Sequence, residues 1–517
     1  MPEPIHRRSA LPTLLLAIAL VVGSSTTPLV AQAGTQSDPL LTAAERSGWE
    51  TLTPHEAVVD FYGALTARSP EIRVREFGRS AADRPLLEVV LSRPAVTTPA
   101  EAHASGKPIV LVNAQVHGDE QASKEALMLF ARDLAVGPLN GLLDEVIFVL
   151  SPQLNPDGAE AGDWGSRNNL RNRNVNRDYL RLDSPETRAF VSQVISAWRP
   201  HVIVDSHELV GPPRIYDFYT SFPRSIEGPT LAYELTRNEI VPAIVEGLAQ
   251  AGFDHFPYHR VTSGLVDDPS IGVSAGSYGA RALSSYGGAR GAITILYESM
   301  RPRDARLNLE SRTRRHHVAM RAMAEYVAAN PERVVETVRG ERAELVARGA
   351  RWDPADSVGI RLEQLASREL DYRMEWEGDT LEFQVPLLDS TRIELGRIRP
   401  VAYLIDPDAV EAARHLALHG VQVERLEAPA RVSAERYRIT SVERASSSYE
   451  GYVQRTFETE VEEVELEAEA GSYLVRMDQP DARIIAHLME PRTRTPWPRW
   501  AGSPPASEPG PCSGSIA

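Results

Sequence analysis

Three residues of this 517-residue chain have the types and spacing needed to bind one divalent metal ion, namely His117, Glu120 and His207. Two imidazoles and one carboxylate are a common ligand set for catalytic zinc, which keeps a further position for water. His117 and Glu120 stand three residues apart in "HGDE", and His207 lies in the later segment "VDSHE". Because an HxxE pair alone is frequent on helix surfaces, the prediction of a metal site depends on where the chain places these segments.

Apolar, strand-like runs alternate with helical patterns between residue 108 and about residue 328. The strand-like runs are "PIVLVNA", "EVIFVLSP", "HVIVDSH" and "GAITILYE", and the helical patterns cover about 120–135, 184–198, 230–251 and 304–328. A helix over about 54–68 and the strand-like runs "EIRVREFG" and "LLEVVLSR" precede them. The alternation predicts an α/β fold, in which a mostly parallel mixed sheet is buried between helices.

Polar residues follow these predicted strands at the ends where ligands bind in such sheets. Ligands of doubly wound sheets bind beyond the carboxyl ends of the strands. His117 and Glu120 follow the first run, "NPDG" follows the second, His207 ends the third and Glu298 ends the fourth. We therefore expect these side chains to meet at one edge of the sheet. The histidines outside such positions are interpreted as structural or surface residues; they are His201, His316 and His317.

The pattern of apolar and polar residues changes after the α/β region. Length predicts two folded domains, and we place a catalytic domain at 54–330 and a smaller strand-rich α+β domain at 345–492. Within the second domain, the glutamate run 458–469 alternates with apolar residues and is interpreted as a solvated strand face. A leader over 34–53 and a disordered tail over 493–517 complete the predicted organisation.

Residues 1–33 have the pattern of a cleaved secretory signal peptide. Arg7 and Arg8 precede an apolar run, and Ala31-Gln32-Ala33 offers a small-residue cleavage site. The run is shorter than the ~20 residues of a spanning helix, which argues against a membrane anchor. We expect a secreted or periplasmic protein without stable membrane insertion. A net charge of -16 argues against nucleic-acid binding, and the single cysteine, Cys512, excludes an intrachain disulfide.

The order of six short motifs resembles that of the zinc carboxypeptidases of the M14 family. The motifs are "GRSAADRPL", "HGDE", "NPDG", "NVNRDY", "VDSHE" and "LYES", spread over about residues 55–328. Each motif alone is weak, but six in the family's order are specific. The resemblance implies a zinc carboxypeptidase-like fold, one Zn²⁺ per chain and a peptide substrate with a free C-terminal carboxylate.

The resemblance also implies roles for individual residues. It makes His117, Glu120 and His207 the zinc ligands and Glu298 the catalytic carboxylate. Asn176 in "NVNRDY" would hold the substrate's terminal carboxylate together with the arginine that follows it. That arginine, Arg177, offers paired donors that match a carboxylate.

Two assignments keep alternatives. Three arginines compete to stabilise the oxyanion: Arg167 ranks first on the family's spacing, Arg171 second, and Arg173 is the third candidate. The tyrosine that would cap the substrate is Tyr278 or Tyr286, and Tyr278 has the more usual separation from the catalytic glutamate.

The predicted function is that of a zinc metallocarboxypeptidase that hydrolyses the C-terminal bond of peptides. One alternative keeps the zinc but acts as an amidase or deacylase on cell-wall peptides or N-acyl amino acids, since a fold alone does not fix a substrate. A second alternative is a non-catalytic peptide-binding relative. Every predicted ligand and catalytic position is filled, which favours an enzyme.

Overall fold

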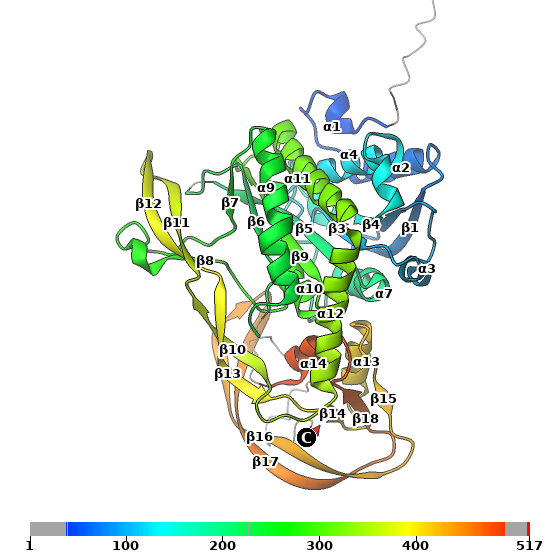
Figure 1. The fold of residues 1–517 in the computed structure, drawn as a ribbon, viewed down its shortest axis with the longest axis vertical. Coiled ribbons are helices and arrows are strands. Elements are labelled where there is room, and N and C mark those ends of the chain that lie inside the picture. The colour runs from blue at the N-terminus through cyan, green and yellow to red at the C-terminus, as the bar shows by residue number, and fades with distance from the viewer. Residues whose placement is uncertain (1–37, 39, 212, 226, 492–513, 517) are drawn as a thin grey trace, which may run out of the picture. The chain divides into compact units, whose positions relative to one another are not determined.

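The computed structural model describes residues 38, 40–211, 213–225, 227–491 and 514–516 (Figure 1). The predicted signal peptide lies outside the described residues, as does the predicted tail apart from the strand Gly514–Ile516. The described residues from Leu40 onward belong to one compact unit. Within the described residues, no helix combines the length and apolar character that crossing a membrane requires.

A mixed sheet of eight strands is the centre of the fold. Its strands are β1 (Ile72–Arg79), β2 (Pro85–Leu91), β3 (Ile109–Asn113), β4 (Ile147–Ser151), β5 (Val202–Val210), β6 (Phe218–Ser221), β7 (His255–Pro257) and β9 (Ile293–Arg301). They lie in the order β1-β2-β4-β3-β5-β9-β6-β7. The four central strands β4, β3, β5 and β9 are parallel, and antiparallel β2 and β6 flank them. The carboxyl ends of the central strands therefore meet at one edge.

Alternate residues of the central strands pack on opposite faces of this sheet. Val110 and Val112 of β3 belong to one hydrophobic core, whereas Ile109 and Leu111 belong to another on the other face. Successive side chains of a strand point to opposite faces, so an uninterrupted apolar run is buried on both. The sequence "PIVLVNA" thus forms a central strand.

Helices cover both faces of the sheet. The elements up to residue 349 are α1 (Ala43–Arg46), α2 (His55–Thr66), α3 (Pro99–Ala104), α4 (Ala122–Val136), η1 (Asn140–Asp144), α5 (Pro156–Ala159), η2 (Val175–Arg177), α6 (Pro185–Ala189), η3 (Phe190–Ile195), α7 (Ser196–Trp198), α8 (Leu231–Leu235), η4 (Thr236–Ile240), α9 (Val241–Gln250), η5 (Pro269–Ile271), α10 (Leu283–Ala289), α11 (Leu309–Ala329) and α12 (Pro331–Gly349). α4, α9 and α11 contribute to the core that contains Val110. α10 and the π-helical η3 contribute to the opposite core.

The later part of the chain is rich in strands. Its elements are β10 (Ser357–Leu365), β11 (Arg368–Trp376), β12 (Asp379–Leu388), β13 (Ser390–Ile398), β14 (Ala402–Ile405), α13 (Val410–Leu418), β15 (Glu424–Arg425), β16 (Ala430–Tyr449), β17 (Tyr452–Ala468), β18 (Tyr473–Arg476), α14 (Ala482–Met489) and β19 (Gly514–Ile516). β16 and β17 form a long antiparallel hairpin, drawn in orange in Figure 1. A short earlier strand, β8 (Val273–Ser274), pairs in parallel with the end of β12.

The observed architecture confirms the predicted fold class, an α/β mixed sheet between helices followed by strand-rich sheets. The glutamate run also has the predicted character, since Glu463, Glu465 and Glu467 on β17 are exposed. One element was not expected: helix α12 spans the predicted gap between 330 and 345. The division into domains at that gap stays a prediction.

Candidate metal and substrate site

His117 and Glu120 lie in the short loop that joins β3 to α4. β3 ends at Asn113 and α4 begins at Ala122, so both residues leave the carboxyl edge of the sheet. Gly118 lets the loop pass against the backbone of Gly158, because a Cβ atom there would lie only 2.1 Å from the Gly158 carbonyl carbon. This close packing fixes the path of the loop.

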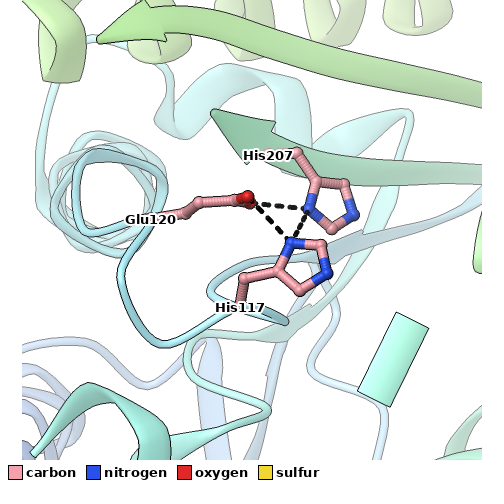
Figure 2. A group of neighbouring side chains, drawn as sticks. All are labelled: His117, Glu120 and His207. Atoms are coloured by element: carbon pink, nitrogen blue, oxygen red, sulfur yellow. Dashed lines mark hydrogen bonds and ion pairs between the residues drawn. The ribbon is translucent and has the colours of Figure 1, made fainter. Parts of the chain in front are cut away.

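The structure brings His207 into contact with both of these residues. His117 Nδ1 lies 2.8 Å from Glu120 Oε1, and His207 Nδ1 lies 2.7 Å from Glu120 Oε2. The two Nδ1 atoms are 3.1 Å apart, and Figure 2 shows both rings turning this nitrogen toward the carboxylate. All three side chains are buried, at the edge where the sequence predicts them.

Polar partners hold the opposite nitrogen of each ring. His117 Nε2 lies 3.1 Å from Asn174 Oδ1, and His207 Nε2 lies 2.9 Å from Asp205 Oδ1. An oxygen partner fixes a proton on Nε2 and leaves the Nδ1 lone pair free to bind a metal. Asn174 is in turn held through its backbone N–H, which donates to Glu450 Oε2 at the tip of the β16–β17 hairpin (3.0 Å).

Burial and opposite charges shift the pKa values of the cluster. Burial lowers the pKa of His117 to about 4, against the opposing effect of Glu120. Burial also disfavours charge on His207, but Asp205 and Glu120 outweigh it and raise its pKa well above the usual value. For Glu120, burial would raise the pKa, and the two histidines hold it well below the usual range. The carboxylates of Asp205 and Glu120 thus favour a positive charge at this position, which a bound cation would supply.

These residues fit a zinc ion. Among the described residues, His117, Glu120 and His207 form a group of three potential ligands whose donor atoms lie within 4.8 Å of one another. Nitrogen and carboxylate oxygen donors in this number suit catalytic zinc. The Nδ1 atoms of both rings and the Glu120 carboxylate face a common centre (Figure 2).

Glu298 is the direct neighbour of His207 on the adjacent parallel strand, because the two residues are register partners of β9 and β5. Both line the same pocket together with Arg167 and Arg177, and we call it the metal pocket. Burial raises the pKa of Glu298 to about 8, with Glu120 acting in the same direction, while His207 and Arg167 lower it. Glu298 is therefore a carboxyl group that can hold or release a proton near neutral pH.

The three candidate arginines occupy different places. Arg167 lines the metal pocket, and its Nη1 donates to Glu120 Oε1 over 3.0 Å with the side chain about half exposed at 48%. Arg171 and Arg173 line a separate cavity beside Tyr452 instead. The guanidinium of Arg173 stacks over the Tyr452 ring at 4.5 Å.

Asn176 and Arg177 both reach the metal pocket. The Asn176 amide nitrogen lies 2.8 Å from His207 Nε2, and its oxygen accepts from the Leu283 N–H over 2.9 Å. Arg177 Nη1 donates to the Asn176 carbonyl at 2.6 Å. Asn176 thus holds the start of α10 and lies against His207, while Arg177 is the more open donor.

Neither candidate tyrosine lines the metal pocket. The Tyr278 hydroxyl donates to the Asp389 carbonyl over 2.9 Å and lines a neighbouring pocket. Tyr286 is fully buried, and its hydroxyl lies 2.8 Å from His419 Nδ1. The capping role of Tyr278 stays a prediction, and Tyr258 is the tyrosine on the pocket wall.

Sequence reasoning missed several cationic residues of the pocket wall. They are Arg224, Arg260 and Arg281, which with Arg167 and Arg177 make the pocket strongly basic. They lie in loops without a recognisable motif. The sequence therefore shows that arginines are present there but not that they face the site. A basic pocket beside a metal cluster is suited to an anionic group of a ligand.

Several known proteins are similar in sequence to this chain. The M14 peptidase family profile, described as zinc carboxypeptidase, matches residues 58–197. The chain is 25% identical over 407 residues to carboxypeptidase 2 of Trichophyton equinum, covering 76% of this chain and 73% of that protein. It is 33% identical over 138 residues to carboxypeptidase E of Caenorhabditis elegans, covering 24% of this chain and 28% of that protein.

Solved structures of carboxypeptidases are also similar. Carboxypeptidase A from Helicoverpa armigera superposes with a TM-score of 0.42 at 17% identity, covering 55% of this chain and 75% of that chain. The family match and the relatives support a metallocarboxypeptidase hydrolase, and the cluster of His117, Glu120 and His207 fits a zinc ion. Residues 58–197 of this chain thus match the zinc carboxypeptidases of the M14 family.

Proposed function

We propose that the protein removes C-terminal amino acids from peptides, with zinc held by His117, Glu120 and His207. The observation that carries the proposal is the convergence of both Nδ1 atoms and the Glu120 carboxylate beside Glu298. When bound, zinc supplies a Lewis acid and lowers the pKa of coordinated water to about 7. Asn174 and Asp205 hold the imidazoles in the orientation that metal binding needs.

Glu298 acts as the general base and then as the general acid. It takes a proton from the attacking water and later delivers it to the leaving amine. Burial raises the pKa of Glu298 to about 8, although the neighbouring His207 and Arg167 lower it. The positive charge of a loaded site acts in the same direction as these cations, which favours the carboxylate form needed to accept the proton.

Arg167 stabilises the negative charge that develops on the scissile carbonyl oxygen. Its side chain is half exposed and, among the described residues, hydrogen-bonds only through Nη1 to Glu120, so the guanidinium has donors left for a substrate oxygen. Arg177 pairs with the terminal carboxylate of the substrate. The other arginines of the pocket wall add to the positive charge that attracts this carboxylate. Asn176 contributes by accepting the Leu283 N–H and so holding the start of α10 beside the pocket.

The test is hydrolysis of an N-acylated dipeptide with a free C-terminus beside the same peptide as its C-terminal amide. Release of the terminal amino acid from the free acid should stop with a chelator and return with zinc. The amide should react at least ~100-fold more slowly, because Arg177 pairs with a carboxylate and not with a neutral amide. Equal turnover of the amide would favour the amidase or deacylase alternative.

A matched pair of variants tests the role of Glu298. Glu298→Gln should reduce kcat by about 10²- to 10⁴-fold while one zinc per chain is retained. Glu56→Gln changes an exposed glutamate of α2 and should leave kcat unchanged. Full activity of Glu298→Gln would contradict the mechanism, and absence of zinc in the wild-type protein would revive the non-catalytic alternative.

The location of the protein is also a proposal. The sequence pattern of residues 1–33, with Arg7 and Arg8 before an apolar run, supports export to the periplasm or beyond the cell. N-terminal sequencing of the protein recovered from the extracellular or periplasmic fraction would test the cleavage after Ala33.

A further inference from the structure

A large cavity lies apart from the metal pocket, and we call it the Tyr452 cavity after the aromatic residue on its wall. Its volume is about 570 Å³, which falls within the roughly 300–1,000 Å³ that small-molecule sites have. Residues from the segment 171–188 form one part of its wall, and residues of α13 and the start of β17 form the other. The described residues that line it differ from those of the metal pocket, so the two sites are separate.

Arginines outnumber acidic residues on this wall by five to two. Both acids are already paired, because Asp183 Oδ2 lies 2.9 Å from Arg181 Nε and Glu411 Oε1 lies 2.6 Å from Arg414 Nη1. The Tyr452 hydroxyl donates to the same Asp183 oxygen over 2.7 Å. The acids of the wall therefore balance the charge of only two of its guanidinium groups.

The other three arginines of the wall have no acidic partner. Arg171, Arg173 and Arg188 form no ion pair within the part of the chain that the structure describes. The chain has 71 aspartates and glutamates against 55 lysines and arginines, so this group of cations is a local exception to its negative charge. Positive charges gathered in a cavity attract an anion from solution.

Arg173 is held by an aromatic ring rather than by an acid. Its guanidinium carbon lies 4.5 Å from the centre of the Tyr452 ring, and its Nη1 is buried without a hydrogen-bond partner. Gly451 allows this close approach, since a Cβ atom there would lie 2.0 Å from Arg173 Nη1. Packing on a ring orients a guanidinium but does not neutralise it. Arg173 therefore keeps a positive charge that a ligand can balance.

A tight turn fixes the backbone that carries two of these arginines. The side-chain oxygen of the buried Asn169 accepts the backbone N–H of Arg171 over 3.1 Å and that of Arg173 over 3.0 Å. Asn172 adopts a left-handed conformation with φ 54°, and its N–H donates to the Asn169 carbonyl over 2.9 Å. Because this backbone is already ordered, binding a ligand here costs less conformational entropy.

The wall favours a charged ligand over an apolar or aromatic one. Apart from Tyr452, Leu418 is the single apolar side chain on the described wall. The guanidinium carbons of Arg173 and Arg181 lie 4.5 and 3.5 Å from the centre of the Tyr452 ring, so this ring is already packed against cations. A guanidinium offers paired N–H donors that match the oxygens of a phosphate or a carboxylate. Several such groups on one wall match a ligand with more than one anionic group.

We propose that the Tyr452 cavity binds a small polyanion, a molecule with two or more phosphate or carboxylate groups close together. Arg171, Arg173 and Arg188 pair with these groups. The inference goes beyond the proposed function and does not depend on it, because it uses no residue of the metal pocket.

A bound polyanion would connect the family-matched region with the later part of the chain. The three unpaired arginines precede residue 197, whereas Tyr452 and α13 belong to the later part. Arg173 also directly precedes Asn174, whose Oδ1 lies 3.1 Å from His117 Nε2. A ligand that binds only the folded chain raises the free energy of unfolding, so occupation of the cavity should raise the Tm.

The first experiment measures binding to the zinc-loaded full chain by calorimetry. Tripolyphosphate and tricarballylate represent the phosphate and carboxylate classes, and sulfate at equal ionic strength is the reference with one anionic group. We expect at least one polyanion to bind at one site per chain, at least about 10-fold more tightly than sulfate, and to raise the Tm. The tighter of the two identifies the class. If both bind no more tightly than sulfate, the inference is wrong.

The second experiment locates the binding site. Arg171→Met/Arg188→Met removes two guanidinium groups that lack an acidic partner and should weaken binding at least about 10-fold. The matched control, Arg321→Met/Arg339→Met, removes two exposed arginines of α11 and α12 and therefore has the same net charge. Its affinity should stay within about threefold of that of wild type, because these charges lie outside the cavity.

The comparison also distinguishes the cavity from the basic metal pocket, which neither double variant alters. Equal affinity in wild type and in folded Arg171→Met/Arg188→Met would overturn the inference. Thermal unfolding without ligand shows whether each variant is folded. If the double variant does not fold, Arg171→Met alone decides: its affinity should fall at least about threefold, and unchanged affinity refutes the site. Removal of zinc by the polyanion would affect all variants alike, so it cannot produce these differences.

Discussion

Asp205 and His207 stand two residues apart on one face of β5, and Asp205 Oδ1 lies 2.9 Å from His207 Nε2. The carboxylate thereby turns His207 Nδ1 toward His117 and Glu120. The strand itself sets this relationship, because residues i and i+2 share a face. The position of a proposed zinc ligand thus follows from strand geometry.

Replacing Asp205 should weaken metal binding. In Asp205→Asn the amide carries no charge to favour the Nε2–H tautomer of His207, so we expect zinc affinity to fall about 10- to 100-fold. Competition with a metal chelator of known affinity measures this change. At saturating zinc, kcat should recover most of its wild-type value; a permanent loss at full occupancy would instead give Asp205 a direct part in the reaction.

Arginine variants should separate the two candidates for the oxyanion. Arg167→Met should lower kcat about 10²- to 10³-fold, the usual cost of losing one oxyanion donor. Arg171→Met should change kcat less than about threefold, because Arg171 is exposed and lines the cavity beside Tyr452. Steady-state kinetics measures kcat, and the zinc content of each variant is measured in parallel. A normal zinc content shows that the substitution has not disturbed the proposed ligand Glu120, which Arg167 contacts. The reverse order of effects would move the role to Arg171.

Two glycine-to-alanine variants should have opposite effects on stability. Gly118→Ala places a methyl group 2.1 Å from the Gly158 backbone and should destabilise the fold by about 1–3 kcal/mol, with weaker zinc binding. Gly63→Ala on the exposed side of α2 meets no atom within 4 Å and should stabilise it by about 0.5–1 kcal/mol. Urea unfolding measures both. A stable Gly118→Ala protein with normal zinc affinity would show that the loop relaxes.

The contribution of His201 to stability should decrease in acid. Burial lowers its pKa to about 3, and its Nδ1 accepts the Ile109 N–H over 3.0 Å, which requires the neutral ring. The unfolded chain takes up this proton near the ordinary value of 6.5. Between these values the unfolded state binds more protons, so stability is fully present above about pH 7 and falls as the pH drops.

His201→Gln removes this titration. Its free energy of unfolding should lie furthest below that of wild type at pH 7–8, and the difference should shrink by up to about 1.4 kcal/mol per pH unit below pH 6.5. Urea unfolding at a series of pH values gives the comparison. A difference independent of pH would mean that the ring is charged in the folded protein.

The sequence predicted those parts of the site that obey local rules. The apolar run before His117 and the segment before His207 are strands because each is uninterrupted and apolar, and their polar residues follow at the same edge. Helix α12 was missed although Val334, Val338 and Leu345 have helical spacing and are buried. Its pattern was present, and only its placement at a presumed boundary hid it.

The remaining parts depend on contacts between distant segments. β12 meets β8 through a pairing of only two residues on each strand, which no periodicity in the sequence indicates. Arg224 joins the site from a loop whose composition is ordinary. Loop-borne side chains are placed by tertiary packing rather than by local propensity, which is why sequence patterns do not locate them.

The bond between Glu450 and the Asn174 backbone joins the hairpin tip to the partner of His117. A shortened protein ending near residue 330 would keep the three proposed zinc ligands but lack this hydrogen bond. Efforts to engineer a minimal enzyme should therefore retain the strand-rich region, since removing it takes away the residue that holds the partner of one imidazole.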